Sequence, residues 1–268
     1  MLYITGTPIG NLEDITIRQL NILKSVDLIA AEDTRHSIKL LNHYDITTKM
    51  TSYHSHSPQS KTDKLVTMLQ EGKSIALITD SGMPIISDPG ADIVSQCLEL
   101  NIGVTTVPGP TALISALVLS GFDATSFVFH GFLGKKQKKD VSFLLKEDKT
   151  IILYEAPHKL VNTIKSLHAS LGSERKVAII REITKRYEEI QRFTLKEALD
   201  HYNETKQIQG EFVIVIEPKE IEQELNTTPI PLQIESYIQK GLTKKDAIKQ
   251  VAKDMNLPKS EVYKETIS

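Results

Sequence analysis

Short runs of apolar and β-branched residues alternate along the chain with longer stretches in which apolar residues recur every three or four positions. The short runs are typical of buried strands and the longer stretches of amphipathic helices. In residues 1–120 we expect strands at Leu2 to Thr5, Asp27 to Ala30, Ser74 to Thr79 and Gly103 to Val107, and helices at Ile15 to Val26, Thr34 to Tyr44, Lys61 to Gln70, Ala91 to Leu100 and Thr111 to Leu119. This alternation predicts a parallel sheet with helices packed on it, and so one α/β domain over residues 1–120.

A second series of elements follows and is richer in strands. We expect strands at Phe127 to His130, Ile151 to Tyr154, Lys176 to Arg181, Tyr187 to Phe193 and Glu211 to Glu217, and helices at Lys159 to Ser170 and Leu195 to Tyr202. The strand near Glu188 follows Arg181 after too few residues for a helical crossover, so these two strands should pair antiparallel. The pattern predicts a second α/β domain over residues 121–218 with a mixed sheet.

The end of the chain differs in kind. Residues 218–231 are rich in Glu and have no apolar period, which indicates a linker. Thr243 can cap a helix with Asp246 at its third position, and a second short helical run starts at Ser260 after a break. We therefore expect a basic helical segment over residues 229–268, similar in outline to a helix-turn-helix. A solvated helical cap and a nucleic-acid-binding element both fit this pattern.

Composition and charge exclude several classes of protein. The chain has 40% hydrophobic and 25% charged residues, as folded soluble proteins do, and its net charge is −2. No global positive field attracts nucleic acid, so such a partner needs a local basic patch. Cys97 is the single cysteine and cannot form an intramolecular disulfide or a cysteine-based zinc site. We expect a cytoplasmic protein without a membrane span, a signal peptide or a metal site, with His54 and His56 as loop residues.

Three loops rich in Gly and Pro follow predicted strands of the first domain: Thr5 to Leu12, Thr79 to Gly90 and Val107 to Ala112. Loops at the carboxyl ends of parallel strands meet at one edge of a sheet, where open α/β sheets bind small molecules. The helix near Thr111 would also direct free N–H groups into such a cleft. The glycine spacing in the first loop departs from the G-x-G-x-x-G fingerprint, which disfavours a dinucleotide.

The second domain contributes its own polar strand ends, at Tyr154 to His158, Arg181 to Lys185 and Gln209 to Phe212. Taken singly, each of these segments is most simply a surface feature, because exposed ion pairs are common and contribute little to stability. Taken with the three loops of the first domain, they suggest a ligand held between two domains.

Several segments together resemble the tetrapyrrole-methylase superfamily and, within it, the branch that methylates the 2′-hydroxyl of a cytidine in 16S ribosomal RNA. The matching segments are Leu2 to Thr16, Ala30 to His36, Ser52 to His54, Asp80 to Pro84, Ser87 to Gly90, Val107 to Ala112, Glu155 to Lys159, Arg181 to Lys185 and Gly210 to Phe212. They occur in the order of that family and span about 210 residues. Met83 and Ser81 depart from it, since the family commonly has Thr and Ala there.

The resemblance implies S-adenosylmethionine as cofactor, held between the two domains. The cofactor-binding residues it implies are Ile9, Asp80, Met83, Ile86, Thr111, Ala112, Tyr154 and Phe212. The residues implied on the substrate side, as catalytic candidates, are Glu32, Asp33, Arg35, Glu182 and Lys185. Arg35 and Lys185 suit phosphate groups, whereas the identity of a general base stays open.

The resemblance also implies RNA contacts. The lysines expected to contact RNA are Lys135, Lys136, Lys138, Lys139, Lys244, Lys245 and Lys249. The expected partners are 16S ribosomal RNA in the small ribosomal subunit and a second copy of the chain in a homodimer. Three alternatives stay open: a tetrapyrrole or diphthine methyltransferase of the same fold, a dinucleotide-dependent oxidoreductase, and a non-enzymatic RNA-binding assembly protein.

Overall fold

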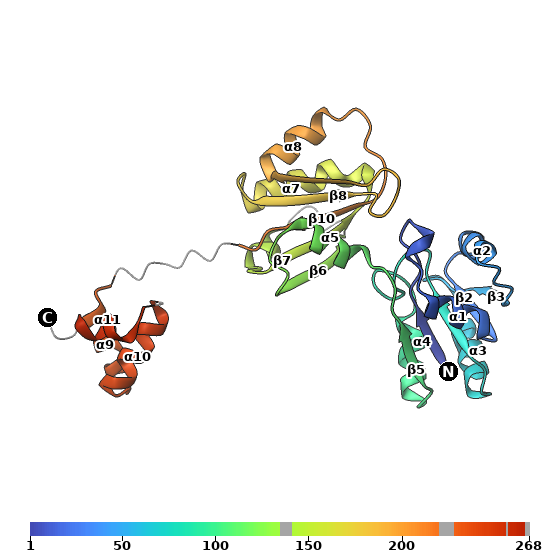
Figure 1. The fold of residues 1–268 in the computed structure, drawn as a ribbon, viewed down its shortest axis with the longest axis horizontal. Coiled ribbons are helices and arrows are strands. Elements are labelled where there is room, and N and C mark those ends of the chain that lie inside the picture. Colours follow the sequence, from blue (N-terminus) through green and yellow to red (C-terminus); the bar gives the residue numbers. More distant parts are fainter. Residues whose placement is uncertain (135–140, 220–227, 256, 266–268) are drawn as a thin grey trace. The chain divides into compact units, whose positions relative to one another are not determined.

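The structure, a computed structural model, describes residues 1–134, 141–219, 228–255 and 257–265. The chain forms two compact units, Met1–Lys219 and Glu220–Ser268. The first unit contains two five-stranded sheets, each covered by helices, and the second unit is helical (Figure 1). The predicted fold class, two α/β sheets followed by a helical segment, is confirmed.

The first sheet is parallel throughout, and its strand order is β3-β2-β4-β1-β5. Its strands are β1 (Leu2–Thr5), β2 (Leu28–Ala31), β3 (Met50–Ser52), β4 (Ile75–Ile78) and β5 (Val104–Val107). Four of them agree with the prediction within one or two residues, whereas β3 was not predicted. β3 is a three-residue edge strand whose side chains are all half-buried, so it has no apolar run that the sequence pattern could show.

Helices cover both faces of this sheet. They are α1 (Ile17–Ser25) and α2 (Thr34–His43) on one face, and α3 (Gln59–Gln70) and α4 (Ala91–Glu99) on the other. Alternate residues of a strand point to opposite faces. Accordingly Ile75 and Leu77 pack with α3 and α4, while Ala76 and Ile78 pack with α1 and α2. A short 3-10 helix, η1 (Leu12–Asp14), precedes α1.

The second sheet is mixed, with strand order β6-β7-β10-β8-β9. Its strands are β6 (Phe127–Phe132), β7 (Thr150–Glu155), β8 (Lys176–Arg181), β9 (Glu189–Thr194) and β10 (Phe212–Ile216). β6 and β7 are parallel, and the other neighbouring pairs are antiparallel. The predicted antiparallel pair is β8 and β9, in which Lys176 lies opposite Thr194.

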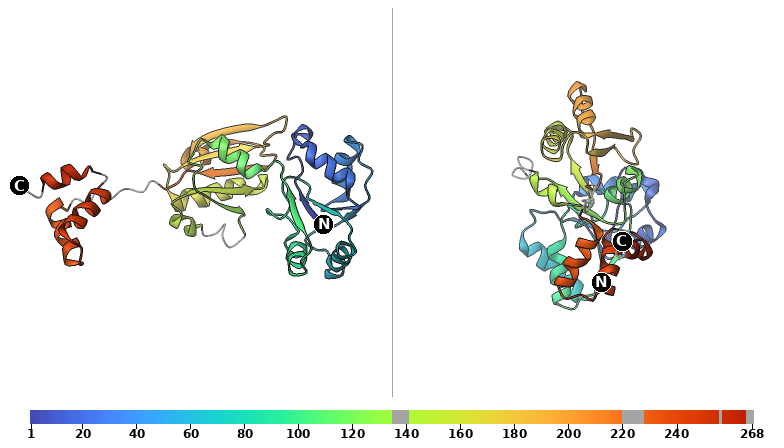
Figure 2. Two further views of the ribbon diagram at one scale, coloured as in Figure 1. Left: turned by 60° about the horizontal axis from the view of Figure 1, so that its bottom comes forward. Right: turned by 90° about the vertical axis from the view of Figure 1, so that its left-hand side faces the viewer.

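Helices also cover both faces of the second sheet. On one face lie α7 (Leu160–Leu171) and α8 (Leu195–Glu204), with η2 (Ser142–Lys146) packed beside α7, while η3 (Pro157–Lys159) leads into α7. The other face is covered by α5 (Ala112–Ser120), as Figures 1 and 2 show. Leu113, Ala116 and Leu117 of α5 pack on this face of the sheet. Although α5 lies within the range predicted as the first domain, its core contacts are with the second sheet.

The C-terminal unit consists of α9 (Ile230–Gln239), α10 (Lys244–Asp254) and α11 (Lys259–Lys264), which share a small apolar core. As predicted, the Thr243 hydroxyl caps α10 and accepts a hydrogen bond from the Asp246 N–H at 3.2 Å. The predicted linker extends too far, because α9 already begins at Ile230. Pro231 is compatible with the first turn of a helix, where no N–H is needed. Within the described residues, no helix is long and apolar enough to cross a membrane.

Candidate active site

One edge of each sheet carries the chain segments that were predicted to bind a ligand. In the first sheet β1, β4 and β5 all end at the same edge, because they are parallel. In the second sheet β7 and β8 end at one edge, and β10 begins there because it runs antiparallel to both. Phe212, the first residue of β10, lies opposite Glu155 and Arg181.

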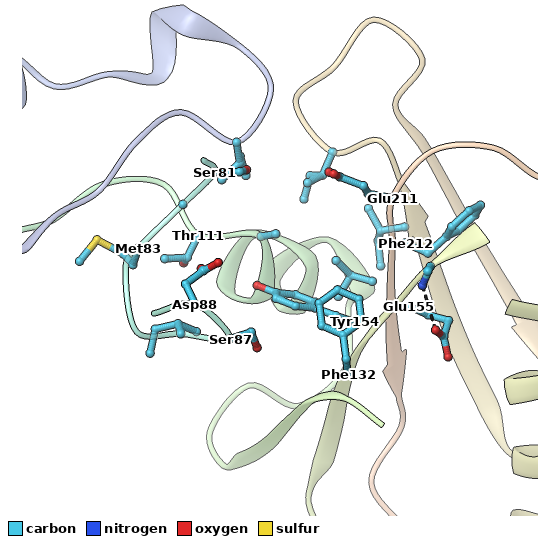
Figure 3. A pocket seen from close by; sticks show the side chains of 18 of the residues that line it. Ser81, Met83, Ser87, Asp88, Thr111, Phe132, Tyr154, Glu155, Glu211 and Phe212 are labelled. Atoms are coloured by element: carbon cyan, nitrogen blue, oxygen red, sulfur yellow. Dashed lines mark hydrogen bonds between the residues drawn. The ribbon is translucent and has the colours of Figure 1, made fainter. Parts of the chain in front are cut away.

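A cavity of about 370 Å³ lies between these two edges (Figure 3). The first half of the chain contributes Ile9, Ser81, Gly82, Met83, Ile86, Ser87, Asp88, Thr111 and Ala112, and the second half contributes Phe132, Tyr154, Glu155, Ala156, Pro157, Ile180, Ile183, Glu211, Phe212 and Val213. Most of these side chains are apolar, and a few polar groups stand among them. This is the usual composition of a small-molecule site, and the volume is in the usual range.

Backbone hydrogen bonds join the loops of the first half to one another. Thr7 and Gly82 exchange two N–H to carbonyl bonds, at 2.8 and 3.1 Å. The Gly6 N–H donates to the Val107 carbonyl at 3.1 Å, and the side-chain amide of Gln19 donates to the Gly6 carbonyl at 2.7 Å. The loops after β1, β4 and β5 are therefore held as one rigid wall.

Two glycines permit the closest of these approaches. A Cβ atom on Gly6 would lie 2.9 Å from the Gly109 Cα atom, and one on Gly109 would lie 3.1 Å from the Gly6 Cα atom. A Cβ on Gly109 would also collide with the side-chain amide nitrogen of Gln19. Gln19 is fully buried and was not predicted as a site residue, although the pattern of Thr16 followed by Gln19 signals a capping box.

Tyr154 closes the cavity from the second half. Its hydroxyl accepts a hydrogen bond from the Leu113 N–H at 3.2 Å, so one of the predicted free N–H groups of α5 is already bonded. The rings of Phe129 and Phe132 contact the Tyr154 ring edge-on, at centroid distances of 4.9 and 5.5 Å. Burial raises the pKa of Tyr154 to about 12, so the phenol stays neutral and can donate its proton in a hydrogen bond.

The carboxylates of Glu32, Asp80 and Asp88 lie close together, in the segments that follow β2 and β4. The Thr79 hydroxyl donates to Glu32 at 2.5 Å, and Asp80 accepts a hydrogen bond from the Asp33 N–H at 3.1 Å. Burial, with Glu32 and Asp80 nearby, raises the pKa of Asp88 to about 6. Burial also raises the pKa of Asp80, with a further contribution from Glu32. Asp88 lines the cavity, yet the sequence indicated it only as a member of a segment that matches the family.

Asp33 and Arg35 form a separate pair in solvent. Asp33 caps α2 and accepts two hydrogen bonds from the Arg35 guanidinium, at 3.1 and 2.7 Å. The Arg35 side chain is 89% exposed. Its guanidinium lowers the pKa of Asp33 to about 2, so both groups are charged over the ordinary pH range.

On the other side of the cavity, Lys185 neutralises two carboxylates. Its ammonium lies 2.9 Å from both Glu182 and Glu211. Burial opposes the effect, but the two carboxylates raise the pKa of Lys185, and in turn the bonds from Lys185 and the Glu211 N–H lower the pKa of Glu182. A Cβ on Gly10 would collide with the Lys185 Cγ atom, so the first loop packs directly against this group.

The structure brings most of the predicted cofactor residues together. Seven of the eight line the cavity: Ile9, Met83, Ile86, Thr111, Ala112, Tyr154 and Phe212. Asp80 does not, and lies instead beside Asp33. None of the substrate-side candidates Glu32, Asp33, Arg35, Glu182 and Lys185 lines the cavity, and each of them forms hydrogen bonds within the chain.

The predicted RNA-contacting lysines belong to the C-terminal unit or lie outside the described residues. Lys135, Lys136, Lys138 and Lys139 belong to the latter group. Lys244, Lys245 and Lys249 are exposed on α10, in the C-terminal unit. Among the residues that the structure describes, no three His, Cys, Asp or Glu side chains are grouped as metal ligands would be.

Comparison with known proteins assigns the family. Residues 1–199 match the family of Tetrapyrrole (Corrin/Porphyrin) Methylases. The chain belongs to the tetrapyrrole methylases. Within them it belongs with the proteins called ribosomal RNA small subunit methyltransferase I, which confirms the predicted resemblance. The relative from Bacillus subtilis (strain 168) is 46% identical over 98% of this methylase and 92% of its own length.

Other relatives with the same name cover different shares of the chain. That from Synechocystis sp. is 44% identical over 98% of this methylase and 96% of its own length. That from Thermotoga maritima is 43% identical, and 99% of its length matches only 82% of this methylase. The remaining share, 18%, is close to that of the C-terminal unit.

Solved structures share the fold. Uroporphyrin-III-C-methyltransferase from Thermus thermophilus has a TM-score of 0.59 at 18% identity, covering 81% of this chain and 93% of its own. A cobalt precorrin-4 methyltransferase has a TM-score of 0.62 at 20% identity, with 81% and 94% covered. Diphthine synthase has a TM-score of 0.61 at 11% identity, with 81% and 89% covered.

Proposed function

We propose that the chain transfers a methyl group from S-adenosylmethionine to the 2′-hydroxyl of a cytidine ribose in 16S ribosomal RNA of the small subunit. The observation that carries this proposal is the similarity over nearly the whole chain to proteins named ribosomal RNA small subunit methyltransferase I. We further propose that the enzyme works in the cytoplasm as a homodimer.

The cavity supports this choice of cofactor. Its apolar walls suit an adenine ring and an aliphatic chain, and its hydroxyl and carboxylate groups suit the polar ends of an amino acid. Uroporphyrin-III C-methyltransferase, a protein of the same fold with a TM-score of 0.57 at 16% identity, was solved with S-adenyl homocysteine. We propose Ile9, Met83, Ile86, Thr111, Ala112, Tyr154 and Phe212 as the residues that hold the cofactor, with Asp80 adjacent to the lining residue Ser81.

In this proposal the protein acts mainly by orientation. S-adenosylmethionine supplies an already activated methyl group when bound. The rigid loops of the first half and the Tyr154 wall of the second hold the two reactants in line, which is the larger part of such catalysis. The ribose oxygen gains the methyl group and its hydroxyl proton is released. Glu32 lies near Asp88 of the first half of the cavity, and Glu182 lies near Glu211 of the second half. We propose that the substrate strand enters between them.

The proposed binding of RNA rests on the positive charges of arginine and lysine side chains. Arg35 and Lys185 are proposed to approach phosphates, although each is already paired with carboxylates of the chain. Lys244, Lys245 and Lys249 on α10 are proposed to bind RNA phosphates in the C-terminal unit, and Lys135, Lys136, Lys138 and Lys139 in the segment after β6. Neutralising any one lysine that binds a phosphate should then reduce the salt dependence of binding by up to about one unit of log–log slope.

The test is the methylation state of ribosomal RNA in cells that lack the gene. Mass mapping of 16S RNA should show the loss of a single ribose methyl group on a cytidine, and the wild-type gene should restore it. Restoration should fail with Ala112→Trp, which fills the cavity. An unchanged 16S RNA would refute the substrate, and a methyl group missing from a tetrapyrrole or from diphthamide would support the alternative of the same fold. Cofactor binding without methyl transfer to any RNA would support the alternative of an assembly protein.

A further inference from the structure

The charged groups that line the cavity are all acidic. Asp88, Glu155 and Glu211 line it, and none of the described lining residues is Lys, Arg or His. A low-dielectric cavity with an uncompensated negative charge favours a cationic ligand over a neutral one of the same shape. The three carboxylates differ, however, in how far their charge is already neutralised within the chain.

Glu155 and Glu211 are engaged elsewhere. Glu155 is buried and accepts hydrogen bonds from the Ala156 N–H and the Thr163 hydroxyl, so it stabilises the turn after β7. Glu211 is 75% exposed at its side chain and is paired with Lys185. Asp88 forms no ion pair among the described residues. In Figure 3 the carboxylate of Asp88 and the hydroxyl of Tyr154 point into the same part of the cavity.

The acidic neighbours of Asp88 add to the negative field around it. Glu32 and Asp80 lie close enough to disfavour its ionisation, whereas a hydrogen bond with the Thr79 hydroxyl, which also donates to Glu32 at 2.5 Å, lowers its pKa. A hydroxyl is neutral and the single proton of Thr79 is shared with Glu32, so this bond does not neutralise the Asp88 charge. A ligand cation is the group that would neutralise it.

We propose that Asp88 makes the cavity prefer S-adenosylmethionine, with its positive sulfonium, over S-adenosylhomocysteine, the product in which the sulfur is neutral. This inference rests on the proposed function. When the ribose oxygen bonds to the methyl carbon, the carbon–sulfur bond breaks and its electron pair stays on sulfur, so the positive charge leaves the cavity and a proton leaves the hydroxyl. Asp88 thereby favours release of the spent cofactor as well as binding of the fresh one.

The experiment measures the dissociation constants of both compounds by titration calorimetry, for the whole protein and for Asp88→Asn. The ratio of the S-adenosylhomocysteine constant to the S-adenosylmethionine constant should fall on the order of tenfold in Asp88→Asn, as expected for one charge at short range in a partly hydrated site. Sinefungin, which carries an ammonium where the cofactor has the sulfonium methyl, should follow S-adenosylmethionine. The matched control is Glu211→Gln, which removes a cavity carboxylate already paired with Lys185 and should leave the ratio within about twofold.

A second measurement requires no variant. In the wild-type protein the ratio should rise as the pH increases from 5 to 8, because Asp88 ionises with a pKa of about 6. The other titratable groups around it are Glu32, Asp80 and Tyr154, with His36 next to Asp80. The ammonium and carboxylate of the ligand are common to both compounds, so their titration cancels in the ratio.

The outcomes separate the two proposals. If neither compound binds, the proposed function is wrong. If both bind, but the ratio is the same in Asp88→Asn as in the wild type and does not change with pH, the role of Asp88 is wrong and the proposed function stands. If Asp88→Asn does not fold, as judged by circular dichroism, the wild-type pH series decides alone.

Discussion

Two groups of carboxylates flank the same cavity and are stabilised in opposite ways. On the side of the first sheet, burial and neighbouring acids raise the pKa of Asp88 and Asp80. On the side of the second sheet, Lys185 lies between Glu182 and Glu211 and lowers the pKa of Glu182 in spite of its burial. The first group keeps a charge available for a ligand, and the second uses its charges to hold the protein together. The residue type alone therefore does not decide the role of a carboxylate in this site.

The largest effect, on cofactor affinity, should come from filling the cavity that the two groups of carboxylates flank. Ala112 lines the cavity at the start of α5, so Ala112→Trp should weaken S-adenosylmethionine binding by at least about 100-fold. The matched control is Val118→Trp, on the same helix at a position 70% exposed, where the ring meets solvent. Calorimetry measures both affinities. Unchanged affinity in a folded Ala112→Trp protein would place the cofactor elsewhere.

The next effect concerns the stability that Lys185 provides by pairing with Glu182 and Glu211. Lys185→Met should lower the free energy of unfolding by roughly 1–2 kcal/mol, mainly because the partly buried Glu182 loses its cation, while the exposed Glu211 contributes little. Chemical denaturation followed by circular dichroism measures the loss. The double variant Lys185→Met with Glu211→Gln should recover a small part of it, since one unpaired charge is gone. If the single variant is as stable as the wild type, the lysine does not hold this side of the cavity.

The third effect is a gain of stability: replacing Asp88 should raise the free energy of unfolding, by an amount that depends on pH. Asp88 has a pKa of about 6 in the folded chain and an ordinary value near 3.8 when unfolded. Between these values the folded state holds the extra proton, so its stability should fall as the pH rises through this window. Above pH 6, Asp88→Asn should therefore be more stable than the wild type by about 1–2 kcal/mol.

A control for this pH effect is Asp27→Asn. Hydrogen bonds from Ser74 lower the pKa of Asp27 to about 2, so Asp27 stays ionised in both states over most of the same window. The stability difference between Asp27→Asn and the wild type should then be nearly constant above pH 5. A wild-type stability that rises instead between pH 4 and 6, relative to Asp88→Asn, would contradict the assignment of the raised pKa.

The smallest effect on the cavity should follow removal of the C-terminal unit. Neither group of carboxylates includes residues from it, and it has a core of its own. Ending the chain at Lys219 should leave the affinity for S-adenosylmethionine within about twofold, while methylation falls through weaker RNA binding and recovers at saturating RNA. A truncated protein that binds cofactor normally and stays slow at saturating RNA would show that this unit orients the ribose.

Much of the fold could be predicted because it follows from local periodicity. Most strands other than β3 have apolar or β-branched runs bounded by turn residues, so their positions along the chain and the antiparallel neighbour of β8 could be inferred, whereas their order in the sheets was not predicted. The packing of α5 could not be inferred in the same way. Its sequence is apolar on nearly every face, so nothing local indicates which sheet it covers.

The apolar part of the site could also be predicted, since loops at strand ends converge for geometric reasons. Asp88 was missed as a site residue because Ser-Asp-Pro-Gly is an ordinary turn sequence, and only the folded chain shows that the carboxylate faces a cavity. Lys185 was predicted near the substrate, and Glu182 lies only three residues before it, but its second carboxylate partner, Glu211, comes from a distant segment of the chain. Charge pairing of this kind is a tertiary property with no local signal.

The contact between Gly6 and Gly109 has a consequence for genetics. A side chain at Gly6 would collide with the main chain of Gly109, one at Gly109 would press against the main chain of Gly6, and each partner is already the smallest residue available. No second substitution at the partner can therefore make room, in contrast to a collision between two large side chains. In a selection for restored function, variants of Gly6 or Gly109 should revert to glycine rather than acquire suppressor mutations.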